Sequence, residues 1–133
     1  MRKIESQMCA AIHNNQNWSN ANTTVHFNEE EIARLGAAGT GICHCPVSNM
    51  RLASGICPTL DLIEAGAPIG LGVDGSASND ASNMMYEARQ ALYLQRLKYG
   101  AEKITPEVVL RWATEGSASV LGRTDIGVIA EGT

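Results

Sequence analysis

Asp74 is the residue of this chain whose surroundings best suit chemistry. It directly follows an apolar run that we expect to form a strand over 68–73, and it opens a Gly- and Ser-rich loop over 74–80. In parallel α/β sheets, ligands and catalytic groups gather at the carboxyl ends of strands. A carboxylate there is desolvated below and open above, which suits a metal ligand or a proton acceptor. The alternative is that Asp74 only caps its own loop through local hydrogen bonds.

His44 is a second candidate, near the end of an expected strand over 40–45. Strand alternation places Cys43 and Cys45 on the face opposite His44, so the three side chains cannot converge on one zinc ion. A lone histidine in a strand is more often a hydrogen-bonded core residue than a catalyst. His13 and His26 are weaker candidates, because His13 lies in a lead-in without a pattern and His26 lies on the edge of a possible strand.

The segment Gly70-Leu71-Gly72-Val73-Asp74-Gly75 matches the dinucleotide-binding pattern G-x-G-x-x-G letter for letter. That chemistry needs the glycines in the turn between a strand and a helix, with the helix N-terminus facing the pyrophosphate. Here the first two glycines fall inside the expected strand, and the next helix begins several residues later. We therefore interpret the match as coincidental and reject a nucleotide-binding module.

Alternating apolar and amphipathic stretches predict the elements that must position these residues. Asn28 with Glu31 three positions later is the pattern of a helix N-cap and its reciprocal partner, and Gly39 is placed to end that helix after Ala38. We expect strands over 40–45 and 68–73, a loop over 46–57, and helices over 58–66, about 81–99, and from 105–106 to a last turn at 121. In the longest helix the expected apolar side consists of Met84, Met85, Ala88, Leu92, Leu94 and Leu97.

The order strand, helix, strand, helix predicts an α/β fold of parallel βα units. Residues 1–24 are an amide-rich lead-in with no strand or helix period, which we expect to be poorly ordered, and residues 25–133 carry the pattern. A third strand is possible at Val25-His26-Phe27. Three strands are too few to close a (β/α)8 barrel, which takes about 250 residues. We therefore expect an incomplete barrel, part of something larger.

Composition excludes several classes of partner. The 133 residues include 10 Lys and Arg against 14 Asp and Glu, and only 5% aromatics, so neither a phosphate-binding stripe nor a stacking surface for nucleic acid is expected. No apolar run approaches the roughly 18 residues that span a bilayer, so no membrane partner is expected. Four cysteines in an acidic chain do not make a disulfide framework. We expect a soluble, cytoplasmic protein.

Three blocks of the sequence closely resemble the amidohydrolase superfamily, in its branch of aminohydrolases acting on purines and triazines. The blocks are Val25-His26-Phe27-Asn28, the stretch His44-Cys45-Pro46-Val47-Ser48-Asn49-Met50-Arg51-Leu52, and Gly70-Leu71-Gly72-Val73-Asp74-Gly75-Ser76-Ala77-Ser78-Asn79-Asp80. The resemblance extends over about four-fifths of the chain. It is closest to the 8-oxoguanine deaminases and to the hydroxyatrazine and chloroatrazine hydrolases.

The resemblance implies a distorted (β/α)8 barrel with a small flanking β-sandwich and one divalent metal, zinc or iron, that generates hydroxide from water. It implies that Asp74 follows the eighth strand, ligates the metal, takes the proton of the attacking water and passes it to the leaving amine. His44, Ser48 and Asn49 would follow the seventh strand and line the pocket for a heteroaromatic small molecule. The implied reaction is hydrolytic deamination of a purine or triazine ring.

Departures from the family pattern predict that this chain corresponds to a C-terminal fragment. The family's other metal-binding histidines belong to strands before the first matching block, and at the sixth strand His26 matches the second histidine of a pair whose first is Thr23 here. One carboxylate cannot hold a catalytic zinc, which takes three protein ligands. We therefore expect that the isolated chain does not retain the metal and is not a competent deaminase. The alternative is a non-catalytic, truncated remnant that forms homo-oligomers through exposed sheet edges.

Overall fold

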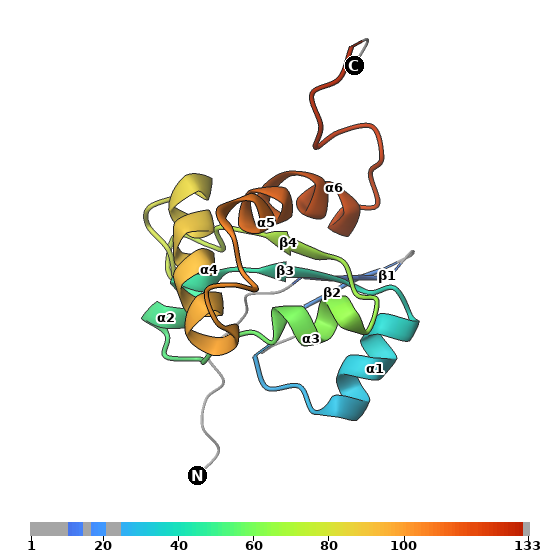
Figure 1. Cartoon of the computed structure of the whole chain (residues 1–133), viewed down its shortest axis with the longest axis horizontal. Helices are drawn as coiled ribbons and strands as arrows, with labels where there is room; N and C mark the ends of the chain where they lie inside the picture. The colour runs from blue at the N-terminus through green and yellow to red at the C-terminus, as the bar shows by residue number, and fades with distance from the viewer. Residues whose placement is uncertain (1–10, 15–16, 21–24, 132–133) are drawn as a thin grey trace.

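A four-stranded sheet in the order β2-β1-β3-β4 organises the fold (Figure 1). The computed structural model describes residues 11–14, 17–20 and 25–131, the first two segments by their backbone only. The strands are β1 (Ala11–Asn14), β2 (Asn17–Asn20), β3 (Gly41–His44) and β4 (Ile69–Leu71). β3 and β4 are parallel and pair His44 with Leu71, whereas β1 is antiparallel to both β2 and β3. The predicted parallel unit is thus confirmed for β3 and β4.

The connection between β3 and β4 contains two helices, α2 (Pro46–Arg51) and α3 (Thr59–Glu64). The loop predicted over 46–57 is therefore wrong in its first half. Pro46 fixes the backbone at the first helical position, where its missing N–H costs nothing. The next amide, Val47 N–H, donates to the side chain of Glu87, 40 residues away. A short helix stabilised by such a distant partner carries no periodic signal of its own.

Two predictions near the N-terminus differ from the structure. Strands β1 and β2 lie within the lead-in 1–24, for which the sequence predicts neither strand nor helix; its other residues lie outside the described part. Conversely, the possible strand Val25–Phe27 is a turn and a bend. Each edge of a strand has one row of backbone hydrogen-bonding groups. β3 pairs with β4 along one edge and with β1 along the other.

The first helix, α1 (Glu29–Ala37), begins and ends as the sequence predicts. Asn28 Oδ1 accepts from Glu31 N–H, and the Glu31 carboxylate accepts from Asn28 N–H, each at 2.9 Å. Gly39, just beyond the end, has a φ of +61°, in the left-handed region that favours glycine. Residues next to the helix therefore set both of its ends.

The longest helix, α4 (Met84–Tyr99), turns a different side to the core than its apolar pattern predicts. Met85 is 66% exposed and Leu97 is 79% exposed, so assigning them to the buried side is wrong. The buried residues are Glu87, Ala88, Ala91 and Gln95. Three of these stand four residues apart and share one face. Small alanines allow close packing, and the two buried polar side chains find hydrogen-bond partners that a hydrophobicity pattern does not show.

Helix α5 (Pro106–Arg111), the π-helical turn η1 (Trp112–Gly116) and α6 (Ser117–Val120) follow one another, and η1 and α6 pack against β4 (Figure 1). A Cβ added at Gly70 would lie 2.8 Å from the backbone Cα of Ser117, so only glycine permits this approach. Gly70 lies inside β4, and the next helix begins only at Met84. The glycine pattern therefore serves packing, which agrees with our rejection of a nucleotide site.

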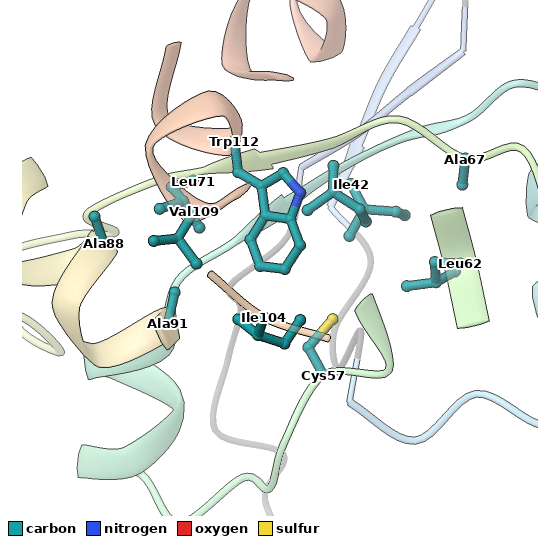
Figure 2. Close-up of a cluster of buried hydrophobic side chains, with 11 residues drawn as sticks. Ile42, Cys57, Leu62, Ala67, Leu71, Ala88, Ala91, Ile104, Val109 and Trp112 are labelled. Atoms are coloured by element: carbon teal, nitrogen blue, oxygen red, sulfur yellow. The ribbon is translucent and has the colours of Figure 1, made fainter. Parts of the chain in front are cut away.

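The hydrophobic core lies between the β3–β4 pair and helices α3, α4 and α5. Figure 2 shows the Trp112 ring among Ile42, Leu71, Val109 and Ile104. Apolar burial of this kind contributes roughly 25 cal/mol per Å² of surface removed from water. Within the described ranges, no helix is long and apolar enough to cross a membrane.

Candidate active site at the carboxyl ends of β3 and β4

Asp74 lies three residues beyond Leu71, the last residue of β4. Between them, Gly72 N–H donates to His44 O at 3.0 Å, so the parallel pairing continues almost to Asp74. Asp74 itself has a φ of +61°, a conformation that is strained for residues with a side chain. Such strain persists where surrounding contacts enforce it, and it is concentrated at functional sites.

Two serine hydroxyls hold the Asp74 carboxylate by the same oxygen. Ser48 Oγ donates to Asp74 Oδ2 at 2.7 Å, and Ser78 Oγ donates to it at 2.5 Å. Ser48 is fully buried in α2, whereas Ser78 belongs to the loop that Asp74 opens. Within the part of the chain that the structure describes, Oδ1 accepts no hydrogen bond. One oxygen is thus fixed, and the other is left to bind a proton or a cation.

Of the residues implied beside Asp74, the structure brings Ser48 into direct contact with it. Asn49 is the next residue of α2 and is only 3% exposed. Its Nδ2 has no hydrogen-bond partner among the described residues. A buried amide nitrogen without a partner is costly, because its desolvation is not compensated. Ser48 therefore donates a hydrogen bond to the Asp74 carboxylate, whereas the Nδ2 donor of Asn49 has no partner among the described residues.

His44 lies in the core rather than at the surface beside Asp74. Its ring is fully buried, and its Nε2 lies 3.4 Å from Gln95 Nε2. Thr59 Oγ1 donates to Gln95 Oε1, which leaves Gln95 Nε2 as a donor towards His44 Nε2 and the Cys57 carbonyl. Burial lowers the pKa of His44 from 6.5 to about 4, so the ring is neutral at neutral pH. This environment agrees with the core-histidine interpretation.

A buried carboxylate, Glu87 of α4, links the two segments that form the site. Its Oε2 accepts from Val47 N–H at 3.1 Å, and its Oε1 accepts from Asn79 Nδ2. Asn79 Nδ2 also donates to Val73 O at 2.7 Å, and Asn79 Oδ1 accepts from Ala81 N–H. Glu87 was not predicted as a site residue, because it lies among the apolar residues of a helix. Its spacing of four and eight residues from Ala91 and Gln95 is the signal that could have found it.

Desolvation by burial raises the pKa of Glu87, and the negative charge of Asp74 adds to this shift. Burial likewise raises the pKa of Cys43 to about 11, with Asp74 and Glu87 contributing. Cys43 is therefore a protonated thiol at neutral pH and a poor metal ligand. A Cβ on Gly72 would lie 2.5 Å from Cys43 Sγ and 3.2 Å from Cys45 Sγ, so both sulfurs lie beside Gly72. His44 faces Gln95 instead, as strand alternation predicts.

Asp74 Oδ1 is the carboxylate oxygen that the two serines leave open to a cation. Across the described residues, no group of three or more His, Cys, Asp and Glu side chains could hold a metal ion together. A catalytic zinc takes three protein ligands and keeps one position open. The described side chains therefore do not fit a metal centre by themselves.

Residues 17–133 match the family model described as the amidohydrolase family. This chain belongs to that family. It is 79% identical, over 108 residues, to an 8-oxoguanine deaminase of Pseudomonas aeruginosa; the match covers 81% of this chain and 24% of that protein.

Solved structures of the family agree with the fold. An atrazine chlorohydrolase from Arthrobacter aurescens TC1 complexed with zinc matches with a TM-score of 0.76 at 37% identity, covering 83% of this chain and 25% of that one. An adenosine deaminase from Xanthomonas campestris with bound zinc matches with a TM-score of 0.74 at 37% identity, covering 80% of this chain and 25% of that one. The chain thus spans about a quarter of the length of these amidohydrolases.

Proposed function

We propose that this chain is the C-terminal part of a metal-dependent aminohydrolase and that it supplies the carboxylate on which the reaction depends. The Asp74 carboxylate, held at the carboxyl end of a parallel strand pair by two serine hydroxyls, carries the proposal. The motif resemblance assigns Asp74 to the aspartate after the eighth strand. The 79% identity to an 8-oxoguanine deaminase supports the same reaction class.

In this proposal the reaction replaces a ring amine by a hydroxyl at an aromatic carbon next to a ring nitrogen. Water adds to that carbon while Asp74 takes one proton from the water. The same carboxyl then gives this proton to the amine, which leaves as ammonia. Asp74 suits both steps because Ser48 and Ser78 fix Oδ2 and leave Oδ1 to carry the proton.

The proposal assigns one metal ligand, Asp74, to this chain. A zinc or iron ion in the full-length protein would lower the pKa of a water molecule bound to it. The two solved relatives with zinc support zinc as the ion. The remaining ligands belong, in this proposal, to parts of the full-length protein beyond the quarter that this chain matches.

We extend the proposal to a purine or triazine substrate, because the matched relatives are named for 8-oxoguanine, adenosine and atrazine. Ser48 and Asn49 lie at the start of α2, and we propose that they border the substrate pocket. The resemblance assigns His44 to the same pocket. Its full burial in contact with Gln95 favours a supporting role over direct contact with substrate.

A chimera tests the proposal. The matched 108-residue segment of the Pseudomonas aeruginosa 8-oxoguanine deaminase is replaced by the corresponding residues of this chain. We expect the chimera to deaminate 8-oxoguanine and the isolated 133-residue chain not to. Asp74→Asn keeps the size of the side chain and should lower kcat/KM by at least about 100-fold. Asp80→Asn, in the same loop but ion-paired to Arg51 at the surface, is the matched control and should keep activity.

Two results would contradict the proposal. One is a folded chimera without activity, and the other is an Asp74→Asn chimera that still turns over at the unsubstituted rate. Activity of the isolated chain would contradict only the assignment of the other ligands to the rest of the protein. The cytoplasmic location stays a prediction.

A further inference from the structure

We propose that Glu87 is a positioning residue for the Asp74 carboxylate: it joins the start of α2 to the loop after β4 and so fixes the hydrogen bond between Ser48 and Asp74. The inference deepens the proposed function and rests on it for the catalytic consequence. Its structural part is independent of activity, because it concerns contacts of described residues alone.

The first half of the link is the hydrogen bond from Val47 N–H to Glu87 Oε2, at 3.1 Å. Val47 lies in the first turn of α2, where backbone N–H groups have no partner within the helix. Cys45, the N-cap residue of α2, makes no side-chain capping hydrogen bond. Glu87 therefore stabilises this helix start, and Ser48 is the very next residue.

The second half is the hydrogen bond from Asn79 Nδ2 to Glu87 Oε1. The orientation of the Asn79 amide is determined by two further contacts, its Nδ2 to Val73 O and its Oδ1 to Ala81 N–H. Val73 immediately precedes Asp74. Glu87 thus bonds to the residue before Ser48 in the sequence. Through Asn79 it is also linked to the residue before Asp74.

The chemistry of the link requires a carboxylate. Glu87 is fully buried, and Asn79 is fully buried beside it. Both Glu87 oxygens accept hydrogen bonds, and a glutamine has only one acceptor oxygen. Its NH₂ group would face either Val47 N–H or Asn79 Nδ2, donor against donor. Asn79 cannot turn to relieve this contact without losing Val73 O and Ala81 N–H. Burying a carboxylate costs free energy unless its oxygens accept hydrogen bonds, and here each Glu87 oxygen accepts one.

Hydrogen exchange on the 133-residue chain tests the structural part. In Glu87→Gln we expect the protection of the Val47 amide, and of the Ser78 and Asn79 amides that donate to Gly75 O, to fall by at least about tenfold relative to the core amides of β3. The matched control is Gln95→Glu, an isosteric exchange at the other fully buried polar position of α4. It should lower global stability as well, but should leave the relative protection of the Val47, Ser78 and Asn79 amides unchanged.

Asn79→Ala provides a second variant in case Glu87→Gln fails to fold. It removes the loop half of the link and keeps the hydrogen bond from Val47 to Glu87. We expect the amides at positions 78 and 79 to lose protection while the Val47 amide keeps it. Equal loss at both places in Asn79→Ala, or unchanged relative protection in Glu87→Gln, would overturn the positioning role.

Kinetics in the chimera test the catalytic consequence. Because positioning acts on the transition state, Glu87→Gln should lower kcat by about tenfold or more and leave KM within about twofold. A purely structural defect would instead lower the fraction of active enzyme, with kcat per active site unchanged. If the unsubstituted chimera is inactive, the proposed function fails, and the exchange result still decides the link. If exchange shifts and kcat per active site does not, the link is structural and Glu87 is not a positioning residue for catalysis.

Discussion

At the residue scale, the decisive feature is that the two carboxylate oxygens of Asp74 differ in their hydrogen bonds. Oδ2 accepts from Ser48 and Ser78, and the backbone at Asp74 is held at a positive φ. The sequence could predict Asp74 because a carboxylate after an apolar strand is a local pattern. It could not predict the link through Glu87, because the two hydrogen-bond partners of Glu87, Val47 and Asn79, lie 40 and 8 residues away in the sequence. They become its neighbours only after folding.

Removal of either serine hydroxyl should impair the carboxylate without removing it. In the chimera, Ser48→Ala and Ser78→Ala should each lower kcat by about tenfold with little change in KM, since each hydrogen bond to a charged group is worth about 1.5–3 kcal/mol. Ser76→Ala is the matched control, because Ser76 is an exposed serine of the same loop. Steady-state kinetics check this, and wild-type kcat in both variants would show that the serines do not set the carboxylate.

Burial of His44 should make the chain less stable in mild acid. Its pKa is about 4 in the folded protein against 6.5 when unfolded, so the unfolded chain binds more protons between these values. Stability from this group is therefore complete above pH 6.5 and is lost as the pH falls towards 4. The shift is worth about 3 kcal/mol at about 1.4 kcal/mol per pKa unit.

Urea unfolding across this pH range measures the effect. His44→Gln should remove this part of the pH dependence, whereas His26→Gln, at an exposed position, should retain it. Equal pH dependence in the His44→Gln variant and in the unsubstituted chain would contradict the assigned burial.

At the scale of elements, local chemistry could be read from the sequence and long-range packing could not. The capping box of α1 and the strand β4 were predictable, since their signals lie within a few residues. Helix α2 and the buried face of α4 were not, because a distant carboxylate supports the first, and alanines with paired polar residues form the second. A hydrophobicity pattern shows neither kind of contact.

Gly70 offers a test of whether the glycine pattern serves packing. Gly70→Ala would place a Cβ 2.8 Å from the Ser117 backbone and should cost about 1–3 kcal/mol in the free energy of unfolding. Gly75→Ala, at the third glycine of the pattern, has nothing within 4 Å and should change stability by less than about 0.5 kcal/mol. Chemical denaturation distinguishes the two. Similar effects at both glycines would argue against the packing explanation.

At the scale of the whole molecule, the chain corresponds to about a quarter of the amidohydrolases it matches, and the state of its sheet edges determines how it behaves alone. Gly72 N–H bonds to β3, so the peptide groups of Leu71 point away from it. Ser117 Oγ accepts from Leu71 N–H at 3.2 Å and lies 3.1 Å from Leu71 O. The edge of β4 is therefore occupied at Leu71. The non-catalytic remnant, which self-associates through sheet edges, remains the alternative.

Ser117→Ala should free the Leu71 peptide groups and strengthen self-association of the chain. Sedimentation over a concentration series should show a larger dimer fraction than in the unsubstituted chain, because an unpaired strand edge offers pairing to another copy. Ser119→Ala, at an exposed position of the same helix, is the control and should leave the mass distribution unchanged. An identical distribution in all three proteins would mean that this edge does not govern association.

Metal content tests the central claim most directly, namely that Asp74 is one ligand of a metal site completed by the rest of a full-length protein. Elemental analysis of the purified proteins should find stoichiometric zinc or iron in the chimera, loss of that metal in its Asp74→Ala variant, and no bound metal in the 133-residue chain. Stoichiometric metal in the isolated chain that is lost in its own Asp74→Ala variant would contradict the account, because the chain would then assemble a complete site by itself.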